Sequence, residues 1–88
     1  MAVDEETPLS RARAIKAKYE TELLRKENVV GVGVGYRRRG GELTDEIAII
    51  VQVRRKVPWR ELSSQNLVPE MLDDVPVDVE VIGPSRAW

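Results

Sequence analysis

An alternation of valine and glycine in residues 28–39 (NVVGVGVGYRRR) constrains the fold of this chain more than any other feature. Side chains on a strand point alternately to its two faces, so the pattern predicts a strand with one β-branched face and one bare face. Glycine destabilises a strand, because it loses the most backbone freedom on folding and packs no side chain. Gly31, Gly33 and Gly35 therefore indicate a face that must stay free of bulk or that another surface approaches closely.

The first element expected along the chain is an amphipathic helix over residues 8–26. Thr7 is typical of an N-cap, and Pro8 is typical of the first helical position. Apolar residues then recur at spacings of three and four, which predicts one buried stripe. The basic bias of this helix is interpreted as a solvated face.

Two further strands are expected after the glycine strand. Gly40 and Gly41 predict a tight hairpin into a strand over residues 46–55. Its Ile/Val row lies beside the valines of the first strand, and Ala48, Ile50 and Gln52 lie on the glycine side. A third strand is expected over residues 75–82, after short helical turns within residues 59–72.

These elements predict an α+β fold in the order α-β-β-short α-β, with the N-terminal helix packed on one face of a small three-stranded, mainly antiparallel sheet. The preferred order places the glycine strand in the middle, with both neighbours antiparallel to it. The alternative places the third strand beside the second and parallel to it. With 88 residues the chain is expected to form a single small domain, residues 1–88, with tails at residues 1–6 and 84–88.

The composition excludes several kinds of reactive site. The chain has no cysteine and no histidine, which removes disulfides, the commonest zinc ligands and histidine-dependent catalysis. The glycines alternate within a strand and do not open a helix, so they do not predict a phosphate-binding loop. Asp73 and Asp74 are interpreted as a turn, because a calcium loop needs spaced oxygen ligands around a glycine. No catalytic, cofactor-binding or metal-binding residue is assigned, and the chain is predicted not to be an enzyme.

Charge and hydropathy bear on the partners and the compartment. The 14 basic and 15 acidic residues nearly balance, so no overall field attracts nucleic acid or an anionic membrane. No apolar run approaches the ~18 residues of a membrane span, and the first ten residues lack the apolar region of a signal peptide. A cytoplasmic protein is therefore expected. The alternative function is a nucleic-acid-binding accessory protein that uses the basic helix together with Arg37, Arg38 and Arg39.

Several short motifs follow the glycine strand in order: Thr44-Asp45-Glu46, Val57-Pro58, Val68-Pro69-Glu70-Met71-Leu72 and Val77-Asp78-Val79. With that strand, they resemble the segment that precedes the catalytic domain in a group of trypsin-like serine peptidases of bacteria and plants. The layout is also similar to the small α+β pro-domains of secreted bacterial peptidases, which act as folding chaperones or inhibitors. The resemblance implies a pro-region-like or accessory role beside a trypsin-like peptidase domain, and it carries over no catalytic residue.

The function expected from the sequence is a non-catalytic protein-interaction module that docks through its sheet. Its partner is another protein or a second copy of the chain, because a small domain with an uncovered face gains stability by dimerising. The expected interaction surface combines the glycine face, its neighbours on the second strand and the last tryptophan: Gly31, Gly33, Gly35, Ala48, Ile50 and Trp88.

Overall fold

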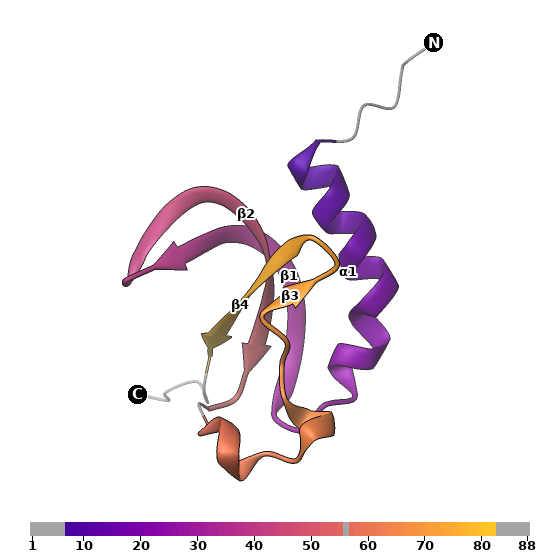
Figure 1. Ribbon diagram of the computed structural model, residues 1–88, viewed down its shortest axis with the longest axis vertical. Coiled ribbons are helices and arrows are strands. Elements are labelled where there is room, and N and C mark those ends of the chain that lie inside the picture. The colour runs from indigo at the N-terminus through magenta and orange to yellow at the C-terminus, as the bar shows by residue number, and fades with distance from the viewer. Residues whose placement is uncertain (1–6, 56, 83–88) are drawn as a thin grey trace, which may run out of the picture.

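The computed structural model describes residues 7–55 and 57–82, which form one helix packed on a four-stranded sheet (Figure 1). The helix and strands are α1 (Pro8–Leu24), β1 (Val29–Arg39), β2 (Glu42–Val53), β3 (Met71–Leu72) and β4 (Val75–Val81). Two 3-10 turns, η1 (Trp59–Glu61) and η2 (Ser64–Asn66), replace the predicted short helix. The predicted α+β class, with the N-terminal helix on one face of the sheet, is confirmed. The predicted tails lie outside the described residues.

A reciprocal cap closes the first turn of α1. The Thr7 hydroxyl accepts a hydrogen bond from the Ser10 amide at 3.1 Å, and the Ser10 hydroxyl accepts one from the Thr7 amide at 2.9 Å. These bonds satisfy backbone donors that a helix start leaves unpaired, and they confirm the predicted start. The helix ends at Leu24, before the predicted Lys26. Asn28 then turns the chain into β1 with a left-handed φ of 79°, a conformation that asparagine tolerates better than most residues.

The strand order β1-β2-β4-β3 corrects the preferred prediction. The glycine strand β1 lies at an edge of the sheet, and β2 pairs antiparallel with β1 and parallel with β4. The cause is the connection over residues 54–74. A parallel pair needs a crossover of a dozen or more residues, and this connection is long enough to return the chain to the far end of β2. The alternative order from the sequence is therefore the observed one, with β3 added antiparallel to β4.

The hydrophobic core lies between α1 and the inner face of the sheet. Leu23, Ile49 and Val51 are its largest fully buried side chains. The core cluster consists of Ala12, Ile15, Leu23, Ile49, Val51, Val53, Leu72 and Val75. The helix packs mainly against β1 and β2 and leaves the end of β4 uncovered, so Val79 and Val81 are 37% and 45% exposed.

Polar contacts attach α1 to the turn between β3 and β4. Arg11 Nε lies 3.0 Å from Asp74 Oδ1. The Tyr19 hydroxyl donates to Asp73 Oδ1 at 2.9 Å, and Lys18 Nζ donates to Asp73 Oδ2 at 3.2 Å. These hydrogen bonds, from Tyr19 first and then Lys18, hold the pKa of Asp73 below its usual value, and the bond to Asp73 raises the pKa of Lys18. The interpretation of these two acids as a turn is confirmed, and the turn also positions the helix.

Candidate functional site: the outer face of the sheet

The outer face of the sheet, turned away from α1, carries the predicted glycine row. The paired residues on this face are Gly31 with Gln52, Gly33 with Ile50 and Gly35 with Ala48. The predicted register of β1 against β2 is therefore confirmed for this row. On β4, Asp78 pairs with Ile50 and Glu80 pairs with Gln52, so two carboxylates extend the same face.

Gly33 is the most open position of the glycine row. A Cβ atom added there would meet no described atom within 4 Å. A Cβ atom at Gly35 would lie 3.3 Å from Ile50 Cγ1, and one at Gly31 would overlap the side-chain oxygen of Gln52. All three glycines lie outside the left-handed region, in contrast to Gly40 in the turn, which has a φ of 58°. Neither backbone conformation nor a described neighbour requires glycine at position 33.

The hairpin arm, which we define as residues 36–47, bends over the outer face. The register shifts between Tyr36 and Arg38, and a bulge of this kind bends a strand pair. The Arg38 amide then donates to Asp78 Oδ2 of β4 at 2.8 Å. Figure 1 shows the ends of β1 and β2 curving away from α1. Ala48 is fully buried although it belongs to the predicted surface, so it lies beneath that surface and cannot itself contact a partner.

An open groove of about 500 Å³ lies between the arm and β4. Its lining residues are Gly35, Tyr36, Arg38, Leu43, Ile50, Asp78, Val79, Glu80 and Val81. Tyr36 and Leu43 on the arm are more than half exposed, at 54% and 61%. Exposed apolar side chains gathered around a groove are typical of an interaction surface. The structure therefore joins two predicted residues, Gly35 and Ile50, to side chains that the sequence did not identify.

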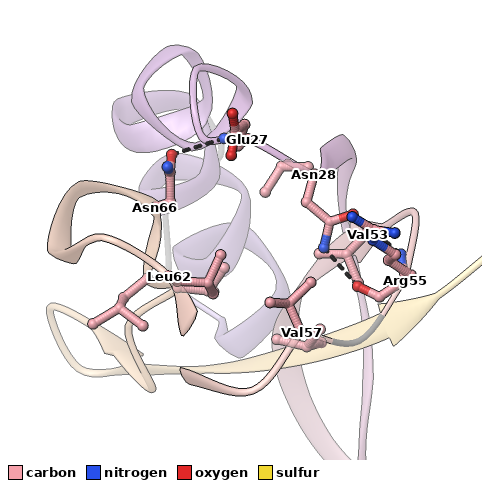
Figure 2. Close-up of a pocket in the computed structure, with 11 residues that line it drawn as sticks. Glu27, Asn28, Val53, Arg55, Val57, Leu62 and Asn66 are labelled. Atoms are coloured by element: carbon pink, nitrogen blue, oxygen red, sulfur yellow. Dashed lines mark hydrogen bonds between the residues drawn. The ribbon is translucent and has the colours of Figure 1, made fainter. Parts of the chain in front are cut away.

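A smaller pocket of about 220 Å³ lies where β1 begins and β2 ends (Figure 2). Its polar rim is hydrogen-bonded within the chain. The Asn28 side chain donates to the Arg55 carbonyl at 2.5 Å and accepts from the Arg55 amide at 3.1 Å. The Asn66 side-chain oxygen accepts from the Glu27 amide at 2.8 Å. The rest of the lining is apolar, and these hydrogen bonds join the chain after α1 to η2 and to the end of β2.

The other predicted features fall in different parts of the molecule. Arg37, in the arm, forms an ion pair with Glu46 at 3.1 Å. The arm carries as many acids as arginines, with Glu42 and Asp45 beside this pair, so it presents no purely basic patch. Trp88 lies outside the described residues.

Neither a metal centre nor a membrane-spanning helix is found in the described part of the chain. Within residues 7–55 and 57–82, no group of three or more metal-ligating side chains is placed to hold an ion. No helix in the same ranges is long and apolar enough to cross a membrane. The absence of enzymatic activity and the cytoplasmic compartment stay predictions.

The amino-acid sequence did not predict the groove between the arm and β4, because the groove forms only where the bulge bends the arm. The Thr44 hydroxyl donates a hydrogen bond to the Arg37 carbonyl at 2.8 Å. The hydroxyl oxygen of Thr44 also accepts a hydrogen bond from the Glu46 amide at 3.1 Å. Three residues of β2 therefore oppose one of β1 at this point. The sequence signal was Leu43, an apolar side chain in an otherwise polar hairpin tip.

Comparison with known families assigns the chain to one of them. The family model described as the NARROW LEAF 1 N-terminal domain matches residues 7–82, a span from the cap of α1 past the end of β4, and the chain belongs to this family. This match corrects the resemblance to the pro-region-like segment of trypsin-like serine peptidases. The motifs behind that resemblance were short valine strands and valine–proline stops, which recur in many small sheets. None of the curated proteins compared with the chain matches it.

Proposed function

We propose that this member of the NARROW LEAF 1 N-terminal domain family is a non-catalytic protein-interaction module that docks a partner protein on the outer face of its sheet. Gly33 carries the proposal. A β-branched residue there would favour the strand, and a Cβ atom at this position would meet no described atom within 4 Å. The glycine lowers the stability of the free domain, and a partner surface that approaches the backbone closely would account for its presence.

The groove beside the glycine row supports the same surface. Tyr36 and Leu43 from the arm expose apolar area around a floor that includes Ile50, and Asp78 and Glu80 of β4 border the groove. A partner side chain placed there would remove this apolar area from water, which contributes about 25 cal/mol per Å² buried. The bare backbone at Gly33 and the groove together offer close approach and an apolar anchor.

The test compares two substitutions that introduce the same side chain, Gly33→Leu on the outer face and Ala17→Leu on the exposed side of α1. The chain and both variants are used as bait, and the captured proteins are quantified by mass spectrometry. We expect both variants to keep the circular dichroism spectrum of the parent. A partner should be retained by Ala17→Leu and lost by Gly33→Leu. Equal capture by the two variants would show that the glycine face is not the docking surface.

A second copy of the chain is the other candidate occupant of this face. The exposed apolar side chains of the groove favour it, because a symmetric pair would bury them twice. Sedimentation equilibrium over a range of protein concentrations decides the point. A dimer that Gly33→Leu dissociates supports self-docking, and a monomeric mass at the highest concentration excludes it.

A further inference from the structure

Strand β4 leaves part of one backbone edge unpaired. β3 pairs only with Val75 and Pro76, and the Val77 amide donates to the Glu70 carbonyl at 2.9 Å. On the opposite edge, the Ile82 amide donates to a carbonyl of β2 at 3.0 Å. Alternate residues of a strand direct their N–H and C=O groups to the same edge. The backbone groups of residues 79 and 81 therefore point away from β2, where no strand of the described residues pairs with them.

The outer face of this edge is acidic. Asp78 accepts from the Arg38 amide at 2.8 Å, and Glu80 accepts from the Gln52 side-chain amide at 3.2 Å. Both donors are neutral, and neither carboxylate forms an ion pair with a described residue. A carboxylate has about four acceptor sites, so each group keeps acceptor sites for a cationic side chain of a partner.

The inner face of the same edge is apolar. Val79 and Val81 are 37% and 45% exposed, and Ile82, the next residue, is 48% exposed. They are exposed because α1 packs mainly against β1 and β2. An added strand would bring its own side chains onto this face and cover them. The edge therefore combines unpaired backbone groups, an acidic face and an apolar face.

A second copy of the chain does not suit this edge when residues 78–80 of the two copies lie at the centre of the pairing. A two-fold axis perpendicular to the sheet would pair β4 antiparallel with its copy. If the axis passes through Val79, Asp78 of each copy faces Glu80 of the other. If it passes through Asp78 or Glu80, that residue faces itself. Like charges directly opposite one another destabilise a strand pair.

We propose that the open edge of β4, residues 78–81, binds an extended segment of a partner protein in which basic and apolar side chains alternate. The basic side chains lie beside Asp78 and Glu80, and the apolar ones cover Val79 and Val81. Backbone hydrogen bonds to the edge supply affinity, and the alternation supplies specificity. The inference rests on the proposed function in taking the chain to be an interaction module, and it names a different surface and the chemistry of the partner.

Titration of the isotope-labelled chain with two heptapeptides, KVKVKVK and EVEVEVE, tests this proposal by amide chemical shifts. We expect the lysine peptide to bind about tenfold more tightly, since opposite charges on adjacent strands attract and like charges directly opposite destabilise the pairing. The largest shifts should fall on the amides of Val79 and Val81. Glu80→Lys should remove most of the preference for the lysine peptide, and Glu42→Lys, which makes the same charge change on the arm, should preserve it.

Methylation of the peptide nitrogens tests the backbone pairing without changing the protein. Two methylated forms of the lysine peptide are compared, one with N-methyl groups on its valines and one with N-methyl groups on its lysines. Each form loses the backbone N–H donors along one edge of the added strand, and the two forms lose them along opposite edges. One of these two peptides should lose binding and the other should keep it. The proposal is overturned if both bind equally, if the shifts lie away from β4, or if Glu80→Lys and Glu42→Lys behave alike.

The glycine face is tested separately in the same titration. Gly33→Leu should leave the binding of the lysine peptide unchanged, because Gly33 lies on β1 at the other side of the sheet. If Gly33→Leu captures the partner as well as Ala17→Leu does while the peptide binds at β4, the glycine-face function is wrong and the proposal for the β4 edge stands. If the peptide does not bind while Gly33→Leu abolishes capture of the partner, the proposal for the β4 edge is wrong and the glycine-face function stands.

Discussion

The two faces of the sheet are made by the same strands and differ in what the fold requires of them. In β2, Ile49 is fully buried beneath α1, and its neighbour Ile50 is half-buried on the outer face beside Gly33. On the inner face, side-chain volume fills the core and determines stability. On the outer face, a Cβ atom added at Gly33 would meet no described atom within 4 Å. The inner face serves folding, and the open position at Gly33 supports the proposal that the outer face docks a partner.

The largest effect expected is a contrast between Ile49→Ala and Ile50→Ala. Ile49→Ala should lower the free energy of unfolding by about 2–5 kcal/mol, because it removes buried methyl groups and leaves a cavity. Ile50→Ala should cost about 1 kcal/mol or less, because that side chain is already partly in water. Urea denaturation followed by circular dichroism measures both. Equal losses would mean that the outer face is packed as tightly as the inner one.

The next largest effect is expected in the turn of the hairpin arm. Gly41 has a φ of 85°, where a Cβ atom is strained. Gly41→Ala should lower the free energy of unfolding by about 1–2 kcal/mol. Gly33→Ala, at a position of ordinary strand conformation, serves as the control and should not lower it. If Gly41→Ala leaves the free energy of unfolding unchanged, the turn adjusts its backbone to the added Cβ atom at little cost.

The glycine row can be tested for its cost to the free domain. Gly33→Val should raise the free energy of unfolding by about 0.5–1 kcal/mol, because valine favours a strand and loses less backbone entropy. Gly35→Val should gain less, since its Cβ would lie 3.3 Å from Ile50 Cγ1. Thermal melts of the two variants give the comparison. A destabilised Gly33→Val would mean that the fold itself requires this glycine.

The smallest effect concerns the exposed contacts that hold α1 on the inner face. The pKa of Asp73 is lowered in the folded chain from a reference value of 3.8. Its contribution to stability is present above the unfolded pKa and is lost as the pH falls through the folded pKa. The free energy of unfolding should therefore decline below about pH 5, and less steeply in Asp73→Asn. Asp45→Asn, on the arm, is the control and should keep the slope of the parent.

The sequence predicted those parts of the fold that depend on local patterns. Thr7 and Pro8 marked the helix start, Gly40 and Gly41 marked the hairpin, and the valine alternation identified the inner row from Val32 onward. At the start of β1 a register shift packs Val29 against the core and leaves the predicted Val30 exposed. The partner of β4 was not predictable from alternation, since a valine row packs equally well beside β1 or β2. That choice depends on the path of residues 54–74, whose irregular turns have no periodic signature.

The candidate site was predictable only in part. Alternation placed Gly33 and Ile50 on one face, and the register confirmed it. The burial of Ala48 and the groove beside Leu43 depend on a bulge that folds the arm back, and the sequence separates the arm from β4 by about thirty residues. Such a contact arises from tertiary structure, and strand periodicity carries no information about it.

The central position of β2 sets an order of assembly. β1 and β2 are joined by a two-residue turn, so their hairpin can close on the microsecond timescale. β4 must first pay the loop-closure entropy of the connection over residues 54–74. Until β4 pairs, one edge of β2, with Ile49 and Val51 beside it, is unprotected. We expect folding to be slowest, and aggregation most frequent, in the interval between closure of the hairpin and arrival of β4.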